Sequence, residues 1–152
     1  KFASLFALDR RGTILAVAYD QSVTTRSVGK NYCFRTYFHG GNKDKPRDVR
    51  TPETKPISQT HLSAVFQSTT TKTWKVAVSS PIYRQEQGRR TVVGVIALTV
   101  NLGDFAYLRN QNRQNHFAVL IDGRPGILQG TILQHPAFDE TLKQSNTENQ
   151  KN

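Results

Sequence analysis

The chain has 152 residues, which is enough for one domain, or for one domain with part of another. Hydrophobic residues make up 36% of it and cluster in short runs, so a core is feasible. A single cysteine, Cys33, excludes an internal disulfide and argues against a disulfide-stapled secreted mini-protein. No apolar run reaches membrane-spanning length and no signal peptide is recognisable, but the chain opens inside a strand-like pattern. We therefore expect it to be a piece of a longer protein.

The net charge of +10 raises the question of an anionic partner. Basic residues crowd the first fifty positions and include Lys43, Lys45, Arg47 and Arg50. Such a cluster can bind nucleic acid or an anionic surface, but a charge run is more often a solvated face. This one lies in a Pro/Gly/Asp loop without the interleaved aromatic residues that base stacking requires. We expect no specific nucleic-acid binding, and a basic nucleic-acid-binding α+β domain is the alternative.

The first predicted element is a β-hairpin. Phe2 to Leu8 and Thr13 to Tyr19 are apolar, β-prone runs, and Asp9 to Gly12 between them is turn-like. Val23 to Phe38 is less regular and predicts a short helix or two with turns. Residues 40–56 contain two glycines and three prolines as breakers, which predicts a loop.

Three strands are predicted after this loop. Ile57 to Gln67 and the alternating, β-branched Thr73 to Tyr83 are the first two. Val92 to Leu102 is almost continuously apolar, which is typical of a central strand covered on both faces. Asp104 to Asn110 predicts a short helix leaving the sheet. This order predicts an α+β fold, a PAS-like five-stranded antiparallel sheet flanked by helices and loops, with a pocket between the sheet and the helical loops.

A short internal echo suggests a second hairpin. The sequence GTIL occurs at Gly12–Leu15 and again at Gly130–Leu133, each time after an apolar run and an aspartate. The prediction is one domain over 1–108, followed by a closing hairpin or part of a second module over 109–143. The polar, Asn/Gln-rich residues 144–152 are expected to be a disordered tail, because they offer no apolar surface to offset the entropy of ordering.

Four segments in order carry a family resemblance. They read FALDRRGTILA, GKNYCFRTYF, THLSAVFQSTTTKTWKVAVSSPIY and VVGVIALTV, and they span roughly the first hundred residues. The chain resembles the PAS-like Cache sensor domains of bacterial transmembrane receptors, with residues 1–108 as the sensor domain. The closing repeat within 109–143 resembles the start of the second, membrane-proximal module of double Cache domains. The resemblance implies an extracytoplasmic (periplasmic) domain, tethered to the cell membrane and compatible with a homodimer. It implies a module that binds a small ligand and transmits a conformational change to a kinase or chemotaxis output, without being an enzyme itself.

The resemblance also implies a ligand site. Arg35, Tyr37 and Phe38 correspond to the arginine and aromatic residues that hold the ligand carboxylate in the family, and His39 extends the group. A guanidinium suits this role because it donates two parallel hydrogen bonds to a carboxylate. The alternative is that Arg35 forms a surface ion pair, while Tyr37 and Phe38 belong to the core.

The chain departs from the amino-acid-binding members of that family at two acidic positions. Ser68 and Thr99 stand where those members have carboxylates, and Phe66 matches the aromatic residue before the first of them. Because a buried ammonium without an anionic partner is costly, we expect a small carboxylate or another polar metabolite rather than an α-amino acid. Ser79 lies on a strand that faces either the pocket or solvent. A spacer whose pocket is filled by Phe38 and Phe66 is a third interpretation.

Other kinds of site have little support in the sequence. The four histidines lack the spacing of a compact zinc motif, and the acids are too few and scattered for a paired-carboxylate hydrolase. Cys33 lies between two aromatic residues, which is typical of a small buried hydrophobe rather than a nucleophile. No phosphate-binding loop or dinucleotide fingerprint is present. We therefore predict no metal, no cofactor and no catalytic residues.

Overall fold

The computed structural model describes residues 2–23, 26–48, 54–102, 119–125 and 129–135. The chain divides into two compact units, Lys1–Asn101 and Leu102–Asn152. The boundaries predicted after residues 108 and 143 lie outside the described residues, as do the helix predicted over 104–110 and the tail over 144–152. No helix in the described ranges is long and apolar enough to cross a membrane.

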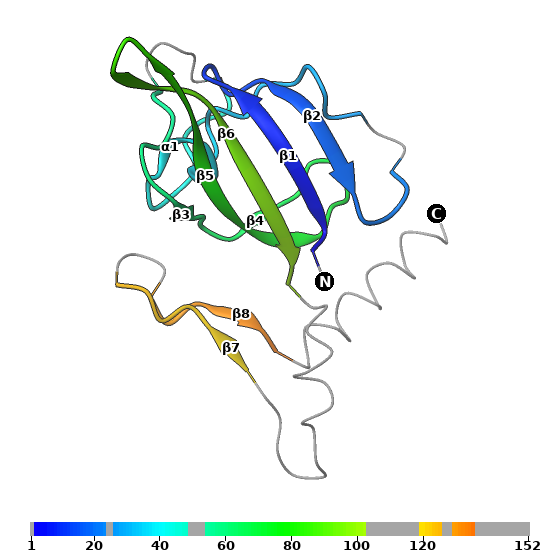
Figure 1. The fold of residues 1–152 in the computed structure, drawn as a ribbon. Coiled ribbons are helices and arrows are strands. Elements are labelled where there is room, and N and C mark those ends of the chain that lie inside the picture. Colours follow the sequence, from blue (N-terminus) through cyan, green and yellow to red (C-terminus); the bar gives the residue numbers. More distant parts are fainter. Residues whose placement is uncertain (1, 24–25, 49–53, 103–118, 126–128, 136–152) are drawn as a thin grey trace. The chain divides into compact units, whose positions relative to one another are not determined.

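The described residues of the first unit form one antiparallel sheet (Figure 1). Its strands are β1 (Ser4–Asp9), β2 (Ile14–Tyr19), β3 (His61–Leu62), β4 (Phe66–Gln67), β5 (Trp74–Glu86) and β6 (Arg89–Asn101). Their order is β2-β1-β6-β5-β3, with β4 also paired to β5. The last long strand therefore lies between the N-terminal hairpin and β5, and the sheet has six strands rather than the predicted five.

The hairpin predicted at the start of the chain is confirmed as β1 and β2. The strands predicted over 73–83 and 92–102 are also confirmed, but β5 and β6 are longer and pair from Lys75 with Asn101 to Glu86 with Arg89. The pairing of β5 and β6 continues to Glu86 and Arg89 because Gln87 and Gly88, both with positive φ, form a two-residue turn between the strands. Such a turn matches the twist of the strands it joins.

The strand predicted over 57–67 is wrong for most of its length. Of this segment, only the two-residue strands β3 and β4 pair with β5. Between them, the Ser63 amide donates to the Ala77 carbonyl oxygen at 2.8 Å, and the other hydrogen bonds involve side chains. Ser63 Oγ accepts from the Ala77 amide at 2.8 Å, and Thr36 Oγ1 accepts from the Ala64 amide at 2.9 Å. These bonds satisfy buried backbone groups without a continuous ladder, and they tie the segment to the helix that precedes it.

The helical content is smaller than predicted. Among the described residues of the first unit, the only helix is α1 (Thr36–His39), and the other described positions between 26 and 35 are turns, irregular chain and a β-bridge at Asn31. The helix ends at Gly40, whose φ of 75° is the left-handed conformation that glycine adopts without strain. The flanking layer of the sheet is therefore mostly loop, with a single turn of helix.

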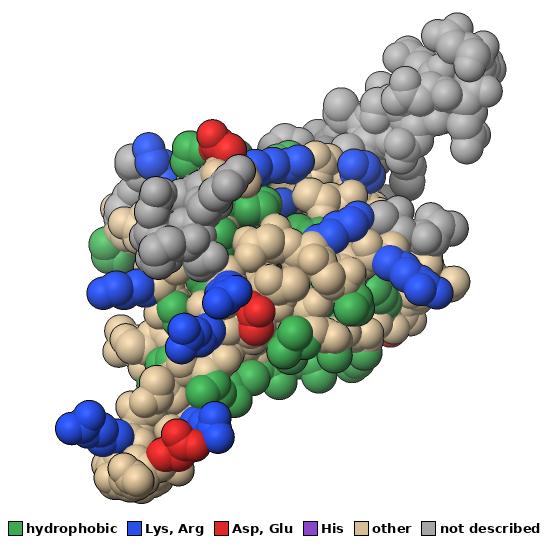
Figure 2. Space-filling model, turned by 90° about the horizontal axis from the view of Figure 1, so that it is seen from above, with side chains coloured by type: hydrophobic (Ala, Val, Ile, Leu, Met, Phe, Trp, Pro, Cys, Tyr) green, Lys and Arg blue, Asp and Glu red, His purple; other side chains and the backbone are tan. Residues whose placement is uncertain are grey.

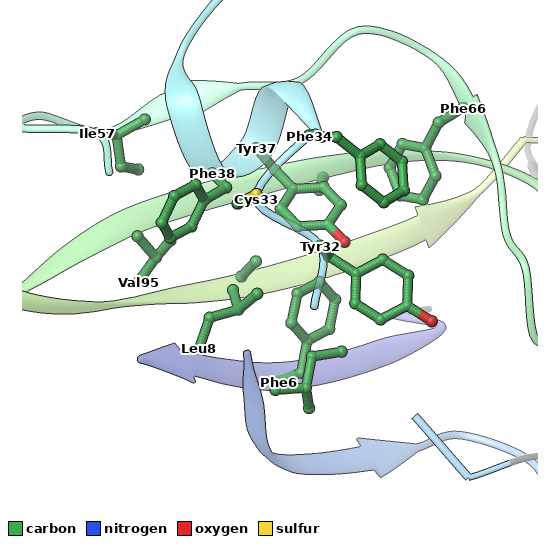
Figure 3. Close-up of a cluster of buried hydrophobic side chains, with 13 residues drawn as sticks. Phe6, Leu8, Tyr32, Cys33, Phe34, Tyr37, Phe38, Ile57, Phe66 and Val95 are labelled. Atoms are coloured by element: carbon green, nitrogen blue, oxygen red, sulfur yellow. The ribbon is translucent and has the colours of Figure 1, made fainter. Parts of the chain in front are cut away.

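The hydrophobic core lies between the sheet and this layer (Figure 3). The inner face of the sheet contributes Phe6, Leu8 and Val95, while Tyr37 and Phe38 of α1 pack onto them. The prediction that Val92 to Leu102 is covered on both faces is wrong for the described part of the chain. The outward-facing apolar residues of the sheet are exposed: Leu5, Val78, Ile82, Ile96 and Leu98.

The described residues of the second unit form a hairpin, as the repeated GTIL sequence predicted. The strands are β7 (Leu120–Ile121) and β8 (Ile132–Gln134), paired antiparallel. Asp122 follows β7, and its carboxylate accepts a hydrogen bond from the Arg124 amide at 3.0 Å. Ile121 and Ile132 are exposed, so this unit carries no described counterpart of the core of the first unit.

Candidate ligand-binding site

A small cavity of about 40 Å³ lies on the inner face of the sheet, under the segments around residues 32–37 and 66–70. Five of the eight residues predicted to bind a ligand line it: Arg35, Tyr37, Phe66, Ser68 and Thr99. The structure therefore brings these five side chains together around one cavity. The contacts of each side chain decide what it can contribute.

Arg35 is buried and its guanidinium is largely occupied by the protein itself. Its Nη1 forms an ion pair with Asp44 Oδ2 at 2.6 Å, and its Nη2 donates to the Gln67 carbonyl oxygen at 2.8 Å. The guanidinium also lies over two aromatic rings, 5.1 Å from the Phe34 centroid and 4.7 Å from that of Phe66. The carboxylate predicted to come from a ligand is supplied here by Asp44. Only Nε is left buried without a hydrogen-bond partner among the described residues.

Lys75 is the residue that the sequence interpretation missed. It lies on β5 opposite Phe66 of β4, lines the cavity, and is 3% exposed. Within the described ranges no acidic side chain forms an ion pair with it. Burial lowers the pKa of its ammonium below the ordinary value, because the charged form is poorly solvated there. The alternation of side chains along a strand could have predicted this, because Lys75 lies on the same face of β5 as the inward-facing Ala77 and Ser79.

Tyr37 supplies a neutral hydroxyl at the same place. Its ring packs edge-on against Phe6 and Phe66, with centroids 5.2 and 5.4 Å away (Figure 3). Burial raises the pKa of this phenol far above its ordinary value, so it stays protonated over the whole physiological range. Within the cavity it can donate a hydrogen bond without bringing a charge of its own.

A ring of hydroxyl groups completes the lining. The pairs are Ser4 with Thr99 at 2.5 Å, Tyr19 with Ser27 at 2.7 Å, Ser27 with Thr70 at 2.8 Å, and Tyr32 with Thr69 at 2.9 Å. In each pair one hydroxyl donates its hydrogen to the other, so only the remaining hydroxyl of a pair is able to donate toward a ligand oxygen. No carboxylate side chain of a described residue lines the cavity. The polar lining is therefore cationic or neutral, which favours an anion.

Ser68 lines the cavity, but its hydroxyl is engaged with the backbone. Its Oγ accepts from the Thr70 and Thr71 amides at 3.3 and 3.1 Å. The hydroxyl thus shapes the turn that closes the cavity, and this turn carries Thr69 and Thr70 into the lining.

Three predicted residues, Phe38, Ser79 and His39, are absent from the cavity lining. Phe38 is fully buried in the core, as the alternative interpretation held. Ser79 is buried and its hydroxyl donates to the His61 carbonyl oxygen at 3.3 Å. Both side chains therefore support the fold next to the cavity and do not reach a ligand in it.

His39 lies outside the cavity because both of its ring nitrogens bind the backbone. Nδ1 accepts from the Gly41 amide at 3.0 Å, which leaves Nε2 to donate to the Phe34 carbonyl oxygen at 3.1 Å. This pattern requires the neutral imidazole, and partial burial lowers its pKa below the ordinary value. His39 therefore fixes the end of α1 and does not extend the anion site.

A wider surface groove of about 280 Å³ adjoins the cavity. The two share Arg35, Phe66, Ser68 and Thr69 in their linings. The groove adds Arg47, Lys72 and the exposed Trp74.

The described residues contain no group of three or more histidine, cysteine or acidic side chains arranged to hold a metal ion. Cys33 is buried, and burial raises the pKa of its thiol, which disfavours the reactive thiolate. No protein-family model, no curated protein and no solved structure matches the chain. The geometry of the cavity is therefore the main guide to function.

Proposed function

We propose that residues 1–101 form a sensor module that binds a small carboxylate in the cavity beneath α1. The observation that carries this proposal is a pair of buried cationic side chains around one cavity, with no described carboxylate in its lining. Lys75 has no acidic partner among the described residues, and Arg35 retains an unpartnered Nε–H. Buried charges are costly when unpaired, so an anion that enters the cavity gains from both groups.

The same proposal assigns the fold of residues 1–101 to the PAS-like Cache domains. One antiparallel sheet, covered on one face by loops and a turn of helix, with a cavity between the layers, supports a PAS-like Cache domain. On this hypothesis the chain is part of the extracytoplasmic region of a transmembrane receptor. The output of that receptor would be a kinase or a chemotaxis module.

The size of the cavity limits the ligand. A volume of about 40 Å³ holds only a few water-sized groups, since one water needs roughly 10–15 Å³ on this scale. Acetate and propionate are ligands of the right size and charge. Their carboxylate would accept hydrogen bonds from Arg35 Nε, from the Lys75 ammonium and from the Tyr37 hydroxyl, while the methyl end meets apolar walls such as Phe6 and Val17.

Signalling would arise from differential affinity. The cavity is closed by Ser68, Thr69 and Thr70 on one side and by the sheet on the other. A bound anion that contacts both sides favours the arrangement in which they are close together, and a coupling of about 1–3 kcal/mol is sufficient to shift a receptor between two states. The loop between β4 and β5 is therefore the element expected to respond to the ligand.

The test is a thermal-shift and calorimetric titration of the whole chain with acetate and propionate, using propionamide as the uncharged match. We expect the acids to raise the melting temperature and the amide to have no effect. Lys75→Gln should remove the response, while Lys72→Gln, at an exposed lysine of the neighbouring groove, should keep it. Equal stabilisation by acid and amide, or none by either, would refute carboxylate binding, and the second result favours a spacer without a ligand.

Arg35→Ala is a poor probe of this function, although Arg35 was the first candidate from the sequence. The substitution removes the ion pair with Asp44 and hollows the stack between Phe34 and Phe66. Deleting one partner of a fully buried ion pair destabilises a protein by roughly 3–5 kcal/mol, and we expect a smaller but still considerable loss here, where the Asp44 side chain is 28% exposed. Loss of binding would then be confounded with loss of folding. Lys75→Gln avoids this problem, because no described acidic side chain loses an ion-pair partner when Lys75 is replaced.

The nucleic-acid alternative has one observation in its favour. Trp74 is exposed and lines the surface groove together with Arg47 and Lys72, a combination that can stack a base and contact phosphate. On the face seen in Figure 2, however, Lys and Arg are scattered and do not gather into one patch. Fluorescence-anisotropy titrations with single-stranded oligonucleotides at two salt concentrations distinguish the nucleic-acid alternative from the carboxylate sensor. Micromolar binding that falls steeply with salt and is lost in Trp74→Ala would support this alternative.

A further inference from the structure

The environment of Lys75 suits a nucleophilic amine as well as a side chain that binds an anion. It is buried in the wall of the cavity, whose lining also contains the cationic Arg35 and the neutral phenol of Tyr37. A lysine that is desolvated, or close to another cation, has a larger share of the unprotonated amine, which is the reactive form. The lowered pKa of Lys75 agrees with this geometry.

We propose that Lys75 forms a reversible imine with a 2-oxo acid bound in the cavity. The inference rests on the proposed carboxylate site, because the acid group is what brings the carbonyl carbon to the amine. It narrows the ligand class from small carboxylates in general to those with a carbonyl group adjacent to the carboxylate, of which glyoxylate and pyruvate are the smallest.

Three of the polar groups that line the cavity match the parts of such a molecule. Arg35 Nε–H is an unpartnered donor for the carboxylate, and Lys75 supplies the amine for the neighbouring carbon. Tyr37 is a protonated phenol that can donate a hydrogen bond to the carbonyl oxygen and make the carbon more electrophilic. A lysine on the protein surface has none of these partners, and it is almost fully protonated at neutral pH.

The reaction balances without a further reactant. The lone pair of the Lys75 nitrogen forms a bond to the carbonyl carbon, and the carbonyl oxygen takes up a proton to give a carbinolamine. The hydroxyl group of the carbinolamine and the remaining proton on the nitrogen then leave together as water, and a carbon–nitrogen double bond forms. No electrons are exchanged with an outside acceptor, and hydrolysis returns the free oxo acid. A sensor could therefore hold such a ligand longer than non-covalent contacts in a small cavity allow.

Reductive trapping tests this inference on the whole chain. Glyoxylate or pyruvate is added with cyanoborohydride, and the intact mass and a peptide map are measured at several pH values. We expect one adduct, equal to the mass of the oxo acid less one oxygen atom, located on Lys75. Its formation should saturate with oxo-acid concentration and be suppressed by an excess of propionate, which occupies the site but has no carbonyl group.

Two variants serve as controls for the labelled position. Lys75→Arg retains a cation but no nucleophilic amine and should lose the adduct, while Lys72→Arg removes an exposed lysine of the adjoining groove and should keep it. Slow labelling spread over the exposed lysines, with no difference between these variants, would overturn the inference.

The failure of this inference can be separated from the failure of the proposed function. If propionate binds in the titration but Lys75 is not labelled, the carboxylate site stands and the imine is refuted. If Lys75 is labelled selectively, but neither propionate nor acetate binds or competes, the amine is reactive and the carboxylate site is refuted. If neither is observed, both are wrong.

Discussion

The hairpins β1–β2 and β7–β8 use the same turn in different settings. Asp9, the last residue of β1, and Asp122, which follows β7, each donate their amide to the carbonyl oxygen of the threonine after the turn glycine, at 2.9 and 2.8 Å. In return, the amide of Gly12 or Gly130 donates to the aspartate carbonyl oxygen, at 3.0 and 2.8 Å. Both glycines have φ above 80°. A short shared sequence is thus sufficient to specify the hairpin connection, even though the second loop is longer.

What differs is the part of the protein that packs on the turn. A Cβ added at Gly12 would lie 2.7 Å from Cys33, and the Gly12 carbonyl oxygen accepts from the Tyr32 amide at 2.7 Å. Among the described residues, nothing lies within 4 Å of the Cβ position at Gly130. The first hairpin is also paired to β6 and forms one wall of the cavity, through Phe6 and Ile14. The comparison separates what the turn sequence determines from what long-range packing adds.

The largest predicted effect comes from replacing the two turn glycines. Gly12→Ala adds left-handed backbone strain to a collision with Cys33 and should destabilise the chain by about 2–4 kcal/mol. Gly130→Ala adds only the backbone strain and should lower the stability of its own hairpin by about 1 kcal/mol. Urea unfolding monitored by Trp74 fluorescence measures the first, and amide exchange in β7 and β8 measures the second. Similar effects of the two substitutions would mean that the packing on the first turn contributes little.

The next largest effect concerns the cavity that the β1–β2 hairpin lines together with Lys75 of β5 and Thr99 of β6. Lys75→Met removes a buried ammonium that has no described acidic partner, and it should stabilise the ligand-free chain by about 1–3 kcal/mol. Because the pKa of Lys75 is lowered in the folded state, the unfolded chain binds more protons between the folded and the ordinary pKa. Unfolding free energy should therefore rise with pH through that interval in the parent and be flatter in Lys75→Met.

The matching control is Lys72→Met, which changes an exposed lysine of the neighbouring groove. It should leave both the stability and its pH dependence within a few tenths of a kcal/mol of the parent. Amide exchange in β7 and β8 should be the same in all three proteins. A destabilised Lys75→Met would show that the ammonium has a favourable partner in the folded chain and would remove the reason to place an anion beside it.

The sequence was informative where local pattern and fold agree. Alternation and turn residues predicted β1, β2, β5, β6 and the second hairpin, because these depend on neighbours in the chain. The segment 57–67 could not be predicted in this way, since Ser63 and Ala64 are fixed by Ala77 and Thr36 from elsewhere in the chain. Five residues named from the resemblance line one cavity, yet the resemblance could not reveal that Asp44 forms an ion pair with the Arg35 guanidinium or that Lys75 points inward. Both facts depend on tertiary packing.

A smaller effect is predicted for the aspartate of the first turn. Asp9 Oδ1 accepts hydrogen bonds from the Arg11 and Thr13 amides at 2.8 and 2.9 Å, so Asp9→Ala should destabilise the first unit by about 1–2 kcal/mol. Asp9→Asn keeps an acceptor oxygen and should recover most of this loss. Urea unfolding of the three proteins decides the matter. If Asn is no better than Ala, the charge of the carboxylate rather than its geometry is what stabilises the turn.

The smallest effect is expected at the aspartate of the second turn, where charge has a clearer role. Asp122 is buried and forms an ion pair with Arg124 Nη2, and this hydrogen-bonded partner lowers the pKa of the carboxyl below its ordinary value. Its contribution to the second hairpin is therefore complete above the ordinary pKa and is lost as the pH falls through the lowered one. Arg124→Gln should raise the pKa of Asp122 toward the ordinary range, so that amide exchange at Gly130 accelerates at a higher pH than in the parent.

A carbon-detected NMR titration of Asp122 measures the pKa directly. If Arg124→Gln left the pKa of Asp122 unchanged, the two turns would be stabilised in the same way, and the second hairpin would differ from the first only in the contacts around it.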